Sequence, residues 1–251
     1  MQSFDDGKLK ALGRIHDGAE ARRAIDAARD AGFGNLNLDL MFGLPGDRPG
    51  DGVIDLEQAL AFAPEHISWY QLTIEEGTAF ARKPPPLPGH DQICDDYECG
   101  VERLAQGGFV QYEISAYARS GREARHNLNY WNRGEYLGAG AGAHSLIRGR
   151  RFWNLARPDH YAEKADDPTA GEEDVSGAEK ALGESLMLGL RLREGVSLGD
   201  IARECGGEPE EIFGGIFSAL ADQGLIEREN KTVRLSRRGT LLANQVLAKF
   251  L

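Results

Sequence analysis

The first 120 residues alternate between two spacings of apolar side chains. Segments 18–32, 51–63 and 90–106 carry apolar residues at the three-to-four-residue interval of amphipathic helices. Between them, 35–41, 66–74 and 108–117 have the short apolar runs of strands. A further short helix is predicted over 5–13. This alternation indicates an α/β protein with parallel strands and helices packed outside them.

The predicted sheet is small for that architecture. About three strands precede residue 120, and so few parallel strands leave an edge exposed and cover their helices poorly. The pattern therefore predicts part of an open barrel, or of a larger sheet, without its first strands.

The pattern after residue 177 is typical of a winged helix. Helices, a predicted hairpin and a last helix follow one another over 179–193, 198–205, 209–223, 225–229, 232–236 and 237–249. The helix in the recognition position, 209–223, has no lysine or arginine, so phosphate contacts are not expected there. We predict three parts: 1–165, an acidic linker at 166–177, and a winged-helix-like domain at 178–251 that packs against the first part or a partner protein.

The composition narrows the class of protein. The formal net charge is −11, which argues against general nucleic-acid binding. No run of about 18 apolar residues is present, so a cytoplasmic protein without a transmembrane segment is expected. Peripheral membrane contact and the oligomeric state are left open. Cys94, Cys99 and Cys205 have no metal-site spacing.

Candidate chemistry concentrates in the run His126–Trp131 and the stretch that ends at His144. The surrounding residues 119–157 hold eight arginines and only two acidic residues. A histidine ligand, stacking rings and guanidinium groups are what a flat metal macrocycle with carboxylates, such as heme, requires. A polar turn rich in core aromatic residues explains the composition equally well.

Polar residues also interrupt the predicted strands. Asn37 and Asp39 alternate with leucines, so they are expected to face a barrel interior near its ligand-binding mouth. Gln71 and Thr73 share one face of the next strand, where ligand binding and a polar interior layer are both open. Glycines 138, 140 and 142 allow a backbone or a flat ligand to approach closely, although their spacing is not a nucleotide fingerprint.

The chain resembles the heme-chaperone branch, HemW, of the family that includes oxygen-independent coproporphyrinogen III oxidase. The resemblance rests on GRIH at 13–16, NLDLMFGLP at 37–45, HISWYQLTIEEGT at 66–78, YEISAYAR at 112–119, HNLNYW at 126–131 and YLGAGAGAH at 136–144. It implies part of a (β/α) radical S-adenosylmethionine barrel followed by a winged-helix-like domain. It also implies that heme is held and passed to acceptor proteins such as respiratory-chain components.

The family signature is a CxxxCxxC loop whose thiolates hold a [4Fe–4S] cluster, with S-adenosylmethionine at the fourth iron site. This chain has no such loop. The resemblance therefore implies an N-terminal truncation, through either the gene itself or its assigned start. We expect heme binding without catalysis by the chain alone.

Site residues follow from the resemblance position by position. Gln2, Arg14 and Asp39 resemble S-adenosylmethionine contacts, whereas Thr73 and His144 correspond in position only. His126 resembles the residue implicated in heme binding and heme-iron ligation, with Asn127, Tyr130 and Trp131 beside it and nearby arginines for the heme carboxylates.

Two other functions stay open. One is a radical enzyme acting on a porphyrinogen, with its cluster on an upstream or separate segment. The other is a winged-helix interaction module without a ligand.

Overall fold

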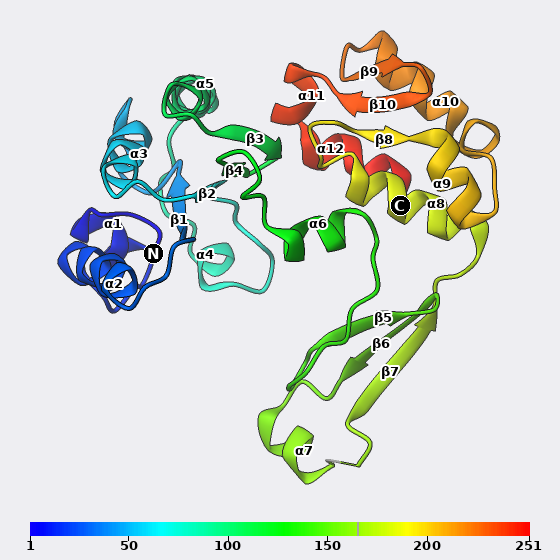
Figure 1. Ribbon diagram of the computed structural model, residues 1–251, viewed down its shortest axis with the longest axis horizontal. Coiled ribbons are helices and arrows are strands. Elements are labelled where there is room, and N and C mark those ends of the chain that lie inside the picture. Colours follow the sequence, from blue (N-terminus) through cyan, green and yellow to red (C-terminus); the bar gives the residue numbers. More distant parts are fainter. Residues whose placement is uncertain (165) are drawn as a thin grey trace. The chain divides into compact units, whose positions relative to one another are not determined.

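The computed structural model describes residues 1–164 and 166–251 (Figure 1). They form two compact units, 1–124 and 125–251, and each is described by itself. The domain boundary predicted at residue 165 lies outside the described residues, and the predicted division into three parts stays a prediction.

The first unit contains one mixed sheet and its covering helices. Its elements are α1 (Asp6–Ala11), α2 (Gly18–Asp30), β1 (Asn37–Phe42), α3 (Asp51–Ala61), β2 (His66–Gln71), α4 (Ala79–Arg82), α5 (His90–Gln106), β3 (Val110–Glu113) and β4 (Ala116–Ala118). The predicted helices and the first two strands are present. The segment predicted as one extended run at 108–117 is instead the two strands β3 and β4.

The sheet has the order β1-β2-β4-β3. Strands β1 and β2 are parallel, as predicted, because α3 returns the chain between them. Strand β4 is antiparallel to both β2 and β3. The described residues do not close into a barrel, and β1 lies at the open edge, where Met41 N–H donates to the Gln2 carbonyl at 2.8 Å.

The two faces of this sheet differ in character. Leu38, Leu40 and Trp69 lie on one face in the buried core, which α2, α3 and α5 cover in Figure 1. A Cβ on Gly100 of α5 would lie 1.9 Å from the Trp69 ring, so this helix approaches the sheet only with glycine there. The opposite face carries polar residues, since side chains alternate along a strand.

The second unit contains two antiparallel three-stranded sheets. Its elements are α6 (Arg125–Trp131), β5 (His144–Ile147), β6 (Arg150–Asn154), α7 (Pro158–Glu163), β7 (Thr169–Asp174), α8 (Ala178–Gly189), β8 (Val196–Ser197), α9 (Leu198–Cys205), α10 (Pro209–Asp222), β9 (Ile226–Glu229), β10 (Thr232–Leu235), α11 (Arg237–Leu241), α12 (Ala243–Leu247) and a final 3-10 turn. The sheet orders are β5-β6-β7 and β8-β10-β9.

The acidic segment predicted as a linker contains strand β7. Its carboxylates lie opposite basic residues of β6: Arg150 pairs with Glu172, and Arg151 lies 3.8 Å from Glu173. Opposite charges across neighbouring strands stabilise the pairing of β6 with β7. The sequence of the acidic segment alone does not reveal these basic partners.

The winged-helix-like arrangement of α8, α9, α10 and the β9–β10 hairpin is present in the second unit, with Phe217 fully buried. The last predicted helix is divided at Leu242 into α11 and α12. None of the helices described here is long and apolar enough to cross a membrane.

Candidate functional site

Three aromatic rings form a ladder on α6 and the loop after it. His126 and Tyr130 lie one helical turn apart with ring centroids 4.8 Å apart, and their planes are nearly perpendicular. The Tyr130 hydroxyl is 3.4 Å from His126 Nε2. Tyr136 continues the ladder, 4.7 Å from Tyr130. His126 is solvent-exposed, so its imidazole can reach a ligand outside the protein.

Tyr136 is a functional candidate that sequence reasoning missed. It follows α6 after a turn, so helical spacing does not relate it to His126. Its backbone pairs with Leu146 through hydrogen bonds of 3.0 and 2.9 Å, which fixes the ring against Tyr130. The tyrosine's place at the start of YLGAGAGAH, two residues before the first glycine, is the signal that could have found it.

An ion-pair cluster centred on the buried Glu184 joins the loop after α6 to β6 and α8. Glu184 of α8 accepts from Arg133 at 2.9 Å and from Arg151 at 2.8 Å. Burial opposes ionisation of Glu184, but the two guanidinium groups outweigh it and lower the pKa of this carboxyl. Arg133 donates further to the Val175 carbonyl at 2.7 Å. The loop after α6, strand β6 and helix α8 are therefore held together at Glu184.

Most arginines of the basic stretch have partners inside the chain. Besides Arg133 and Arg151, ion pairs engage Arg150 with Glu172 and Arg157 with Asp159. In the described part of the second unit, Arg125 and Arg148 are exposed and form no ion pair. These two arginines are therefore free to meet the carboxylates of a ligand.

The other members of the predicted heme segment are less exposed. Trp131 is half-buried beneath Arg191, whose guanidinium carbon lies 5.0 Å from the ring centroid. This packing joins α6 to the residues after α8. Asn127 is half-buried on the same helix.

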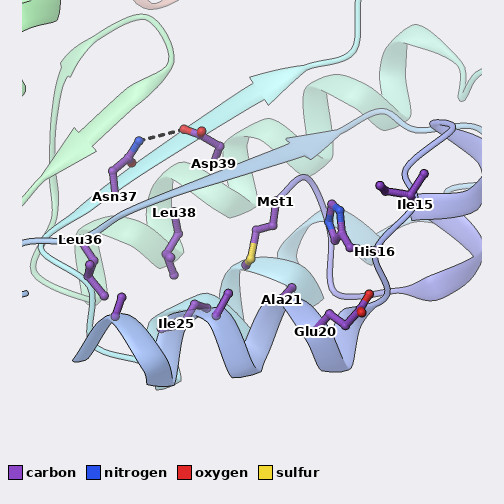
Figure 2. Close-up of a pocket in the computed structure, with 12 residues that line it drawn as sticks. Met1, Ile15, His16, Glu20, Ala21, Ile25, Leu36, Asn37, Leu38 and Asp39 are labelled. Atoms are coloured by element: carbon purple, nitrogen blue, oxygen red, sulfur yellow. Dashed lines mark hydrogen bonds between the residues drawn. The ribbon is translucent and has the colours of Figure 1, made fainter. Parts of the chain in front are cut away.

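The first unit has a groove of about 620 Å³ along the free edge of β1. Figure 2 shows Leu36 and Leu38 on the side of α2, facing Ala21 and Ile25, while Asn37 and Asp39 lie on the other side of β1. Two polar atoms there have no hydrogen-bond partner within the described residues: the buried Nε2 of His16 and Oδ2 of Asp39. An apolar wall with few polar groups is typical of a small-molecule site.

The predicted S-adenosylmethionine contacts are distributed unevenly. Asp39 lines the groove, Gln2 contacts β1 through its backbone, and Arg14 is exposed directly before the groove residues Ile15 and His16. Thr73 lies beyond β2 and donates to Glu75 at 2.9 Å. His144 belongs to the second unit, where it stacks on Trp153 at 5.7 Å. Within the described part of the first unit, no hydrogen bond joins Thr73 to Asp39, and His144 belongs to the other unit.

The glycine stretch before His144 permits a close backbone approach, as its spacing predicts. A Cβ on Gly138 would lie 2.1 Å from the His144 carbonyl oxygen. Gly140 and Gly142 have positive φ angles, so the segment is a loop and not a regular strand.

Comparison with known proteins shows the family of this chain. The heme chaperone HemW of Bacillus subtilis (strain 168) is 36% identical over 100% of this chain and 68% of its own length. That of Haemophilus influenzae is 38% identical over 100% of the chain and 66% of its own length. Residues 178–242 match the HemN C-terminal domain. This chain belongs to the HemW family.

The solved structures agree on the fold. A coproporphyrinogen III oxidase (HemN) from Escherichia coli, described as a radical SAM enzyme, superposes with a TM-score of 0.82 at 19% identity and covers 100% of this chain. The chain spans 62% of that protein and about two thirds of the HemW relatives named above. The partial radical SAM architecture expected from the sequence is thus confirmed.

The family's iron–sulfur cluster has no matching donor set here. Cys94 and Cys99 lie on α5, and Cys205 lies on α9 in the other unit. Among the described residues, no group of three histidine, cysteine or acidic side chains can hold a metal ion. Three thiolates are needed for the cluster, so these residues do not fit it.

Proposed function

We propose that this chain is the heme-binding part of a HemW-type chaperone, which holds heme and passes it to an acceptor protein in the cytoplasm. The observation that carries the proposal is the exposed His126 at the head of the aromatic ladder. Family membership and the free cations Arg125 and Arg148 support it. The second unit's acidic α10 gives no support to a nucleic-acid partner.

In this proposal His126 ligates the iron, the ladder supplies aromatic surface, and a guanidinium pairs with a propionate. Because His126 is exposed on a short helix, an incoming ligand from an acceptor can replace it without unfolding of the protein. An exposed single ligand suits cargo that must be released. Trp131, packed under Arg191, would hold α6 in place.

A hemin titration followed at the Soret band tests the proposal. We expect His126→Ala to weaken binding at least about tenfold, since loss of an axial ligand costs more than about 1.4 kcal/mol. His160→Ala, which removes an exposed histidine of α7, is the matched control and is expected to bind as the unaltered chain does. Equal affinity in all three proteins would contradict the assignment.

We further propose that the groove beside β1 binds S-adenosylmethionine. The unpartnered His16 Nε2 and Asp39 Oδ2 can meet polar groups of the ligand, while the alanine-lined wall of α2 accommodates its apolar parts. S-Adenosylmethionine supplies radical chemistry only when it meets a reduced iron–sulfur cluster. This chain's residues would bind and orient it.

Calorimetric titration with S-adenosylmethionine tests the groove. Asp39→Asn is expected to lower the affinity about tenfold, because a hydrogen bond to a charged group is worth about 1.5–3 kcal/mol. Asp91→Asn on α5 serves as the control. No saturable heat with the unaltered chain would remove the groove from the proposed function.

A further inference from the structure

Four polar side chains form a continuous hydrogen-bonded chain across the polar face of the first sheet. It runs from Tyr112 Oη to His66 Nε2 at 2.8 Å, and from His66 Nδ1 to Asn37 Oδ1 at 2.7 Å. Asn37 Nδ2 then donates to Asp39 Oδ1 at 2.8 Å. Ser68 also donates to Asn37 Oδ1, at 3.2 Å. The chain crosses β3, β2 and β1 and ends at the groove.

The donor and acceptor of each hydrogen bond in this chain follow from Asp39, the residue at its end. An ionised Asp39 only accepts, so the Asn37 amide must turn Nδ2 toward it and Oδ1 toward Ser68 and His66. An oxygen acceptor requires that His66 Nδ1 carries a proton. In neutral His66 the other nitrogen then accepts, and the Tyr112 hydroxyl must donate to it. The arrangement leaves a single consistent set of proton positions.

The chemistry around His66 favours this neutral form. Its side chain is 3% exposed, and burial lowers its pKa, although the charges of Asp39 and Glu123 act in the opposite direction. The hydroxyl of Tyr112 also accepts from the Ala124 N–H at 3.4 Å, which restrains its rotation.

We propose that His66 is a positioning residue: it fixes the Asn37 amide so that Asp39 presents one free carboxylate oxygen to a nucleoside ligand in the groove. This inference rests on the proposed binding of S-adenosylmethionine there. Asp39 Oδ1 already accepts from Asn37, so Oδ2 is the carboxylate oxygen that is still without a partner in the described residues and can accept from a ligand hydroxyl or ammonium group. Without His66, the amide could turn its oxygen toward Asp39 and repel it.

The tautomer is a direct readout that does not depend on any ligand. Nitrogen NMR of the full chain, ¹⁵N-labelled at histidine, is expected to show His66 protonated at Nδ1 near neutral pH, whereas imidazole in water prefers Nε2–H. Tyr112→Phe removes the donor to Nε2, so that the Nε2–H form with the Asn37 amide turned over becomes accessible, and we expect its share to rise. An Nε2–H form in the unaltered chain would overturn the inference.

Binding of S-adenosylmethionine by calorimetry is the second readout. We expect His66→Ala and Tyr112→Phe each to lower the affinity about tenfold. His66→Asn places an amide donor where Nδ1 was and is expected to restore the affinity to within about threefold. His90→Ala, an exposed histidine of α5, is the control. Thermal melts show whether each variant folds. If His66→Ala does not fold, the more conservative Tyr112→Phe still tests the inference.

The outcomes separate this inference from the function it rests on. Binding that is unchanged in His66→Ala and Tyr112→Phe overturns the positioning role alone. No binding by the unaltered chain overturns the groove's function and, with it, the positioning role, even when the Nδ1–H tautomer is observed. Equal losses in His66→Ala and His66→Asn would assign His66 to general stability of the sheet.

Discussion

At the scale of single residues, the environment of each side chain shows whether it is accessible to a ligand or packs inside the protein. His126 and Tyr130 differ from Trp131 although all three belong to one short motif. His126 is exposed and its ring contacts that of half-buried Tyr130, whereas Trp131 lies beneath Arg191. His66 had no role assigned from sequence, and the structure places it at the centre of a polar chain that reaches Asp39.

Tyr136 gives a residue-scale prediction. Its ring extends the ladder beyond Tyr130, and such aromatic contacts are worth about 0.5–1.5 kcal/mol. Tyr136→Ala is therefore expected to weaken hemin binding about two- to tenfold in a Soret titration, while Tyr136→Phe, which keeps the ring, is expected to stay within about twofold. Unchanged binding in the alanine variant would show that the ladder ends at Tyr130.

At the scale of elements, the ion-pair cluster around Glu184 links the loop after the predicted heme segment to the rest of the second unit. Arg133 follows α6, Arg151 belongs to β6, and Glu184 belongs to α8. Three elements distant in sequence thus share one buried carboxylate. Removing the carboxylate leaves the half-buried Arg133 without a counter-charge and Arg151 with only the more distant Glu173, which costs more than the pairs themselves contribute.

The cluster predicts a pH-dependent stability. The folded-state pKa of Glu184 is below its ordinary value, so its contribution is present above about pH 4.3 and is lost as the pH falls through the folded-state pKa. We expect Glu184→Gln to destabilise the chain by about 3 kcal/mol near pH 7, with a difference that shrinks in acid. Denaturant unfolding at several pH values measures it.

The matched control for this prediction is Glu163→Gln, at an exposed position of α7 that forms no ion pair in the described part of the chain. Its stability is expected to follow that of the unaltered protein at every pH. A loss in Glu184→Gln that is as large at pH 3 as at pH 7 would assign the effect to packing and not to the carboxylate's charge.

At the scale of the whole molecule, the two units divide the proposed work. The first carries the groove and the polar chain, and the second carries the aromatic ladder and the domain matched by the HemN C-terminal model. The open edge at β1 agrees with a chain that spans about two thirds of its HemW relatives. The three-part division predicted from sequence stays a prediction, and the segment 166–177 contains strand β7.

The sequence by itself determined the local elements. Helix α5 has the predicted bounds of 90–106, and α2, α3, α9 and α10 lie within two residues of theirs. Apolar spacing determines such elements because a helix or strand shows its buried face in its own few turns. The motif HNLNYW likewise identified the family without any tertiary information.

Only the tertiary structure decided which residues meet. His66 bonds to Asn37 and Tyr112 across 29 and 46 positions, and the antiparallel hairpin β3–β4 brings Tyr112 within reach. Tyr136 and the Glu184 cluster are further examples. Contacts between distant segments depend on strand order and register, which the periodicity of one segment does not contain. The sequence therefore marked the chemistry of His126 and Asp39, and the fold supplied the groups that hold both in place.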